Sequence, residues 1–236
     1  MLKGIIFDKD GTLVELGNSW DQPTIEVVNI LLEETDLTEN EKKAFKLSIG
    51  VTDTAILSNS TVAAGSIEDQ AKAISLVLPL SVAEISERIE SYFMDYFKGR
   101  QDPIPVIDGV VESLETLKDQ GYFLGVVTND NQKLTDMMLT RAGLISYFDF
   151  IGNADQYGSK PESSAFDVIH ANHGIPPHEL VYVGDSSVDM EFGAKTKAAI
   201  GLALEDEHLD HLKEADYIIR SFTELIPLLS KLNELN

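Results

Sequence analysis

Short apolar runs of strand length recur along the chain, separated by stretches in which apolar residues follow helical spacing. Apolar runs bounded by turn residues predict buried strands, and helix-length amphipathic stretches between them are typical of a βα repeat. The predicted strands are Gly4–Phe7, Phe123–Thr128, Phe148–Gly152, Leu180–Gly184, Ala198–Leu202 and a shorter Tyr217–Ile219. The predicted helices between them are Val110–Gln120, Gln132–Ala142, Ala165–His173 and Met190–Thr196. This alternation predicts an α/β fold with a mostly parallel sheet covered on both faces.

One interval near the N-terminus breaks this rhythm, because its pattern predicts helices only. The helices expected there are Thr24–Glu34, Glu39–Ile49, Ile67–Leu78 and Val82–Phe97. Thr38, with Glu41 three residues later, has the spacing of a capping box and predicts the start of the second helix. Pro103 and Pro105 favour an extended return to the sheet. We therefore predict an α/β core domain of residues 1–14 and 101–236, and an inserted helical domain of residues 15–100 hinged near residues 16–18 and 99–102.

The first predicted strand leads directly into two aspartates, Asp8 and Asp10. Side chains two residues apart on a strand point the same way, so both carboxylates are expected to project from the carboxyl end of the strand. Ligands of open α/β sheets bind at that end. Carboxylates packed so closely repel each other unless a cation or a shared proton compensates, which makes the pair a candidate functional site. Lys9, between them, is expected to face away from that site.

Further polar motifs follow the later strands. Thr128 and Asn129 end the second predicted strand, where a hydroxyl and free N–H groups suit a phosphate oxygen. Lys160 lies in a later loop, and its ammonium can stabilise a carboxylate and a phosphoryl group together. Asp185 and Asp189 follow a buried strand, four residues apart and so on one face of a helical turn. Each motif alone is also common in plain turns or on helix surfaces, and their order at successive strand ends favours a site.

Together these motifs resemble those of the haloacid-dehalogenase-like superfamily, most of whose members are Mg²⁺-dependent phosphatases. The matching segments are Asp8-Lys9-Asp10-Gly11-Thr12-Leu13, Val126-Val127-Thr128-Asn129, Lys160-Pro161 and Gly184-Asp185-Ser186-Ser187-Val188-Asp189. The resemblance covers essentially the whole chain and implies a Rossmann-like core with a helical C1 cap inserted after the first motif. Residues 63–71 and 215–219 are most similar to phosphoglycolate-phosphatase-like members.

The resemblance implies catalytic and phosphate-binding roles. Asp8 would be the nucleophile that forms an aspartyl phosphate, and Asp10 the acid that protonates the leaving alcohol and then deprotonates water. Lys160 would complete the catalytic set. Thr128, Asn129 and Lys160 would bind the phosphate, and Thr128 would donate from both its hydroxyl and its backbone N–H.

The resemblance also implies a magnesium site. Its ligands would be Asp8, Asp185 and the backbone carbonyl of Asp10. Asp189 would not bind the ion directly but would hold a bound water or Lys160. Mg²⁺ is therefore the expected cofactor, and oxygen ligands of this kind suit it.

Composition and charge narrow the possible partners and the location. The chain has 236 residues, 43% of them hydrophobic and 25% charged, which is ordinary for a globular protein. Its net charge of −22 argues against nucleic acid and opposes long-range attraction of a phosphorylated substrate, so any phosphate site must be built locally. No apolar run approaches the roughly 18 residues of a membrane span. The chain has no cysteine, and its first strand leaves no room for a signal peptide, so we expect a cytoplasmic protein.

We therefore expect a Mg²⁺-dependent phosphatase that hydrolyses a small phosphorylated metabolite, phosphoglycolate or a similar phosphate monoester. One alternative is a sugar-phosphate mutase of the β-phosphoglucomutase type, which returns the phosphoryl group to a substrate hydroxyl. Another is a non-catalytic phosphate-binding protein on the same fold. A dehalogenase is disfavoured because it needs neither the Asp10 acid nor a metal. The sequence predicts neither the exact substrate nor the oligomeric state.

Overall fold

The computed structural model describes residues 1–15, 17–100 and 102–234, which form two compact units. One unit combines Met1–Glu15 with Ile104–Asn236, and the other is Leu16–Pro103. Leu16 and Gln101, which fall within the expected hinges, lie outside the described residues. The second unit is thus an insertion into the first.

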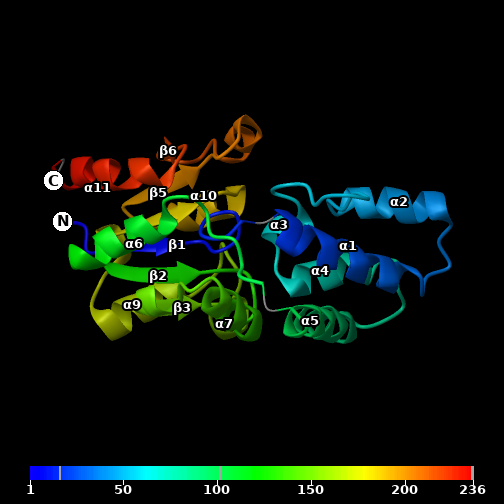
Figure 1. The fold of residues 1–236 in the computed structure, drawn as a ribbon. Coiled ribbons are helices and arrows are strands. Elements are labelled where there is room, and N and C mark those ends of the chain that lie inside the picture. Colours follow the sequence, from blue (N-terminus) through cyan, green and yellow to red (C-terminus); the bar gives the residue numbers. More distant parts are fainter. Residues whose placement is uncertain (16, 101, 235–236) are drawn as a thin grey trace. The chain divides into compact units, whose positions relative to one another are not determined.

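The first unit contains a six-stranded sheet in which all pairs of neighbouring strands among the described residues are parallel (Figure 1). In spatial order its strands are β3 (Phe150–Gly152), β2 (Phe123–Val127), β1 (Gly4–Phe7), β4 (Leu180–Gly184), β5 (Ala198–Leu202) and β6 (Tyr217–Ile219). The predicted α/β class and parallel sheet are confirmed. Strands are added on one side of β1 up to β3 and on the other side from β4 onward. This change of direction is a topological switch point, and ligands of such sheets bind there, outside the carboxyl ends of the strands.

Helices pack on both faces of this sheet. They are α6 (Val110–Asp119), α7 (Gln132–Arg141), α8 (Ala154–Tyr157), α9 (Ala165–His173), α10 (Ser187–Gly193) and α11 (Leu225–Glu234), with short 3-10 turns at Ile145–Tyr147, Pro177–Glu179, Asp206–His211 and Phe222–Glu224. Because side chains alternate along β1, Ile6 joins the core layer that contains Phe166 of α9 and Phe192 of α10, whereas Phe7 stacks on Phe222. The central strand is therefore buried from both sides, which fixes the position of the residue that follows it.

The second unit is helical, as its pattern predicts. It consists of α1 (Gly17–Leu32), α2 (Glu39–Ser48), α3 (Thr61–Ala64), α4 (Ile67–Ile74) and α5 (Val82–Lys98). Four residues of α5 at helical spacing are buried, and two of them, Phe93 and Phe97, pack edge-on against Trp20 with ring centroids 5.0 and 5.6 Å away. The capping box of Thr38 and Glu41 is present. These aromatic contacts thus form part of the core of this unit, beside buried aliphatic residues such as Leu31 and Ile74.

Several predicted boundaries were wrong. The first helix of the insert begins at Gly17 and contains Pro23, instead of starting at Thr24. The helix expected at Met190–Thr196 spans Ser187–Gly193, because the Ser186 hydroxyl caps it one turn earlier. The C-terminal helix Leu225–Glu234 was not predicted. Within the described part of the chain, no helix combines the length and apolar character needed to cross a bilayer.

The cap of α5 provides a stability test for the helical unit. Ser81 accepts a hydrogen bond from the backbone N–H of Glu84, whose carboxylate accepts one from the Ser81 N–H at 2.9 Å. We expect Ser81→Ala to lower the free energy of unfolding by about 1 kcal/mol, because a helix donor loses its partner. Urea unfolding followed by circular dichroism measures this. Ser91→Ala, an exposed change on the same helix, is the control, and an equal loss in both variants would contradict the capping account.

Candidate active site

Three adjacent strands deliver the candidate site residues to one edge of the sheet. Asp8 directly follows β1, Thr128 follows β2 and Asp185 follows β4, so each enters from the carboxyl end of its strand. Lys160 comes from the loop between α8 and α9, where it lies in a turn and does not begin a helix. Residues separated by up to 177 positions in the sequence, Asp8 and Asp185, thereby meet at the switch point.

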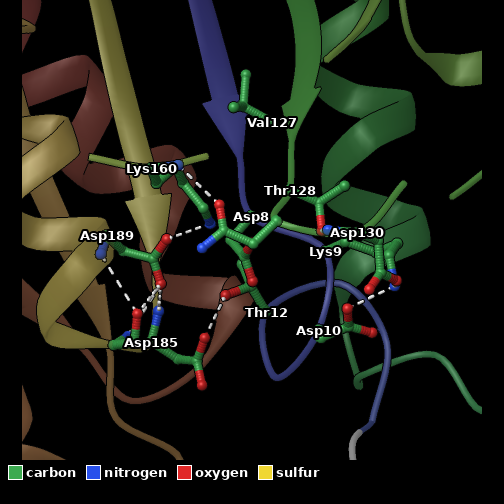
Figure 2. Close-up of polar contacts among 12 residues, drawn as sticks. Asp8, Lys9, Asp10, Thr12, Val127, Thr128, Asp130, Lys160, Asp185 and Asp189 are labelled. Atoms are coloured by element: carbon green, nitrogen blue, oxygen red, sulfur yellow. Dashed lines mark hydrogen bonds and ion pairs between the residues drawn. The ribbon is translucent and has the colours of Figure 1, made fainter. Parts of the chain in front are cut away.

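The Lys160 ammonium is the centre of the site (Figure 2). Its Nζ lies 2.5 Å from Asp8 Oδ1 and 2.6 Å from Asp189 Oδ1, and it donates to the Tyr182 hydroxyl at 3.1 Å. All four side chains are buried. Burial alone would lower the pKa of Lys160, but Asp189 and Asp8 raise it above its ordinary value, so this lysine is a permanent cation. The structure thus brings together the Asp8, Lys160 and Asp189 predicted from three separate motifs.

Asp189 is held by protein donors on both of its oxygens. Its Oδ1 contacts Lys160 and accepts from Tyr182 at 2.9 Å, and its Oδ2 accepts from the backbone N–H groups of Asp185 and Ser186. Although burial would raise the pKa of Asp189, Lys160 lowers it. A Cβ on Gly184 would lie 2.4 Å from the Asp189 Cβ, so only glycine fits this turn. Of the two roles expected for Asp189, the structure shows contact with Lys160.

Asp185 faces the loop of the first motif. The Thr12 hydroxyl donates to its Oδ1 at 3.2 Å. Gly11 has φ +75°, and a Cβ there would lie 2.3 Å from Asp185 Oδ2, so glycine lets the loop approach the carboxylate. Burial, together with the charges of Asp189 and Asp8, raises the pKa of Asp185 well above its ordinary value. Asp185 is therefore a partly exposed acid whose neighbours include two further carboxylates.

The charge balance and the donor atoms fit a divalent cation. Carboxylate oxygens of Asp8, Asp185 and Asp189 lie within 4.8 Å of one another. Lys160 compensates one of these three negative charges, which leaves two. A hard cation such as Mg²⁺ prefers oxygen ligands of this kind. The Asp10 side chain is not part of this group, and the expected contribution of its backbone carbonyl stays a prediction.

Lys9 and Asp10 differ from expectation. Lys9 is fully buried, and its Nζ lies 2.5 Å from Asp10 Oδ2 and 2.9 Å from Asp130 Oδ2. The prediction that Lys9 faces away from the site was therefore wrong, because it contacts the candidate acid. Figure 2 shows the Asp10 carboxylate directed toward Lys9 and not toward Lys160. The two carboxylates of the first motif thus belong to two separate ion-pair groups.

The second motif also requires correction. The Thr128 backbone N–H donates to Gly152 O at 3.0 Å, so the prediction that it binds phosphate was wrong. The Thr128 hydroxyl accepts from the Asp130 N–H at 3.3 Å, and its own proton stays available for a donor role. Asn129 Oδ1 accepts from the Lys160 backbone N–H at 2.7 Å, so Asn129 holds the loop that carries this lysine. Its contact with phosphate stays a prediction.

Three residues of the site were not identified from the sequence: Tyr182, Asp130 and Lys9 in its bridging position. Tyr182 is the only side chain of β4 with a polar group, and its hydroxyl touches both Lys160 and Asp189. A polar tip within an otherwise aliphatic buried strand is a signal that could have pointed to it. Asp130 directly follows Asn129. Its ion pair with Lys9 joins residues far apart in the sequence, so residue spacing could not predict it.

Comparison with known proteins decides the family. The sequence model of the haloacid dehalogenase-like hydrolases matches residues 5–202, which include every residue of the site described above. The chain belongs to this family. Its membership accounts for the strand order and for the motifs at successive strand ends.

Relatives of this hydrolase bear the names of phosphatases. A probable phosphatase from Dickeya dadantii, IndB, is 28% identical over 94% of this chain and 91% of its own length. A phosphoglycolate phosphatase from Haemophilus influenzae is 27% identical over 96% of this chain and 98% of its own. Among solved structures, a β-phosphoglucomutase from Clostridium difficile covers 100% of this chain and 99% of its own with a TM-score of 0.71. At 17% identity that likeness shows the fold alone.

The Asp8 carboxyl group of this hydrolase has a pKa well above the ordinary value for an aspartate. Burial raises its pKa from 3.8 to about 7, with Lys160 acting in the opposite direction and the nearby Asp189 and Asp10 adding to the rise. Without a bound cation, the folded protein therefore holds a proton on Asp8 at pH values where the unfolded chain has lost it. Between about pH 4 and pH 7 the folded state binds more protons, so the contribution of Asp8 to folding stability falls as the pH rises.

This linkage predicts a pH dependence that Asp8→Asn removes. In the presence of EDTA, we expect the wild-type free energy of unfolding to fall more steeply than that of Asp8→Asn between about pH 5 and about pH 8. Urea unfolding at several pH values measures both slopes. Parallel pH profiles for the two proteins would show that Asp8 has no raised pKa.

Proposed function

We propose that this protein is a Mg²⁺-dependent phosphatase that hydrolyses a small organic phosphate monoester through an aspartyl phosphate on Asp8. One observation carries the proposal: a buried carboxylate at the switch point, Asp8, lies 2.5 Å from a buried ammonium and close to two further carboxylates, Asp185 and Asp189. Three carboxylates compensated by a single ammonium are costly for stability, and such a group is typical of a site with a chemical task. The family and the names of its relatives support the same reading.

The proposed reaction has two steps. In the first, a carboxylate oxygen of Asp8 attacks phosphorus, the bond between phosphorus and the ester oxygen breaks, and Asp10 gives its proton to the leaving alkoxide. In the second, water attacks the aspartyl phosphate and gives a proton to Asp10, which releases inorganic phosphate and restores Asp8. Lys160 and the Thr128 hydroxyl are proposed to bind the non-bridging phosphate oxygens. Fixed positive charge and hydrogen-bond donors at these oxygens stabilise the charge they carry in the transition state.

Asp8, Asp185 and the backbone carbonyl of Asp10 are the proposed ligands of the magnesium ion. When bound, the ion neutralises charge on the phosphoryl oxygens and on the two carboxylates. Asp189 is not a proposed ligand of the ion, since both of its oxygens already accept hydrogen bonds from the protein. The chain's own residues thus supply the nucleophile, the acid and the fixed cation.

The substrate class follows from charge and from the helical insert. A chain of net charge −22 does not attract anions from a distance, so a small metabolite bound locally by Lys160 and the proposed metal ion suits it better than a polyanion. We propose that residues 15–100 are the cap domain that selects the leaving group, and that phosphoglycolate or a similar small phosphate monoester is the substrate. A cytoplasmic location fits such a substrate.

Loss of the nucleophile provides the direct test. With Mg²⁺, we expect phosphate release from 2-phosphoglycolate and 4-nitrophenyl phosphate, and in Asp8→Asn a loss of kcat on the order of 10³-fold or more. EDTA should abolish the wild-type activity, and added Mg²⁺ should restore it. Asp119→Asn, the same change at an exposed position on α6, is the control and should keep full activity. An Asp8→Asn protein as active as the wild type would refute the mechanism.

Phosphorus NMR separates hydrolysis from phosphoryl transfer. On a panel of glycolate, sugar and nucleotide phosphates, a phosphatase accumulates inorganic phosphate. Isomerisation of a sugar phosphate without release of inorganic phosphate would instead assign the mutase reaction. Mg²⁺ binding without turnover of any panel member would assign the non-catalytic alternative.

A further inference from the structure

A second buried lysine stands beside the proposed acid, and the mechanism above gives it no task. Lys9 has no exposed surface, and its side chain reaches two carboxylates that come from different motifs. One is Asp10 of the same loop, at 2.5 Å, and the other is Asp130 after β2, at 2.9 Å. This group is separate from the one around Lys160, as Figure 2 shows. A fully buried ammonium with two partners has little freedom to move.

We propose that Lys9 is a positioning residue that fixes the Asp10 carboxylate for proton transfer to the leaving group, with Asp130 anchoring the ammonium. This inference rests on the proposed function, because it assigns a task within that reaction. The step it serves is the first one, in which the Asp10 proton passes to the ester oxygen as the bond from phosphorus to that oxygen breaks. Lys9 exchanges no proton and touches no substrate in this proposal.

The arrangement explains why a charged residue occupies this buried position. A carboxylate on a loop samples several rotamers, and each one that points away from the substrate lowers the rate. The ion pair with Lys9 restricts the Asp10 carboxylate to one rotamer, which in this proposal is the one that faces the leaving group. The Asp130 carboxylate lies in the bend that follows β2, three residues after the strand ends, so the ammonium links the loop after β1 to the loop after the neighbouring strand. Without Lys9, the neighbouring Asp130 charge would repel Asp10.

A change of leaving group isolates this task from a merely structural one. An alkyl phosphate such as 2-phosphoglycolate needs protonation of its alkoxide, whereas 4-nitrophenolate leaves without a proton. The value of kcat/KM reports the steps up to departure of the leaving group. A defect in proton donation therefore lowers kcat/KM for the alkyl ester selectively, whereas a loss of folded structure lowers both values together.

The test compares Lys9→Met with Asp10→Asn and with a matched surface change. Lys118→Met also breaks a lysine–aspartate ion pair, but on the exposed side of α6. We expect Lys9→Met to lower kcat/KM for 2-phosphoglycolate about tenfold more than for 4-nitrophenyl phosphate, in the same direction as Asp10→Asn, and Lys118→Met to change neither. Lys9→Gln, which keeps a polar donor in the same space, takes its place if the methionine variant does not fold.

The outcomes separate the two proposals. The role of Lys9 is overturned if Lys9→Met leaves the ratio of kcat/KM for 2-phosphoglycolate to kcat/KM for 4-nitrophenyl phosphate unchanged. The proposed function stays intact in that case if Asp8→Asn is inactive and Asp10→Asn loses activity mainly toward 2-phosphoglycolate. A wild-type protein that hydrolyses neither ester overturns both. A selective loss in Lys9→Met, measured at a temperature at which circular dichroism shows the variant to be folded, supports the positioning role.

Discussion

The Lys160 ammonium, held between Asp8 and Asp189, is the interaction on which the rest of the site depends. Carboxylates removed from water are costly unless a charge or hydrogen bonds compensate, and this lysine contacts two of them within 2.6 Å. Its position is fixed in turn by the Asn129 side chain and the Tyr182 hydroxyl. Residues from four separate segments of the chain therefore converge on a single cation. Without that cation, the buried aspartates would repel each other and the loops that carry them.

The sheet makes this convergence possible. Three adjacent parallel strands, β2, β1 and β4, end at the same edge, and their buried side chains leave the following residues little choice of position. Asp8 directly follows β1, which is buried along its whole length, so the core of the protein positions its carboxylate. Reaction chemistry that depends on positioning and fixed charge requires such rigidity.

The elements with strong patterns could be predicted from the sequence, together with the residue types of the site. The apolar runs that form β1, β4 and β5 were located to the residue, because short, fully apolar runs bounded by turn and polar residues predict buried strands. Helix starts failed where a single hydroxyl decides them, as at Ser186. The direction in which each side chain points was harder to predict from the sequence. Alternation along a strand predicted that Lys9 faces away, but β1 ends at Phe7, so alternation no longer applies there.

Contacts between segments were the least predictable part. The pairing of the Thr128 N–H with Gly152 depends on which strand lies beside β2, and the contact of Asn129 with Lys160 depends on how a distant loop folds back. Neither leaves a local signature in the sequence. Family resemblance supplied the candidates, and the geometry redistributed their tasks, so that Asn129 and Asp189 support Lys160 and Lys9 supports Asp10.

The central claim, that Asp8 becomes phosphorylated, has a direct measurement. Rapid acid quenching during turnover, followed by borohydride reduction and peptide mass spectrometry, converts an aspartyl phosphate to homoserine and marks the residue that carried it. The account predicts homoserine at position 8 in the wild-type protein, and only in samples that contained substrate and Mg²⁺. Steady turnover with position 8 unmodified, or with the modification on another aspartate, would contradict it.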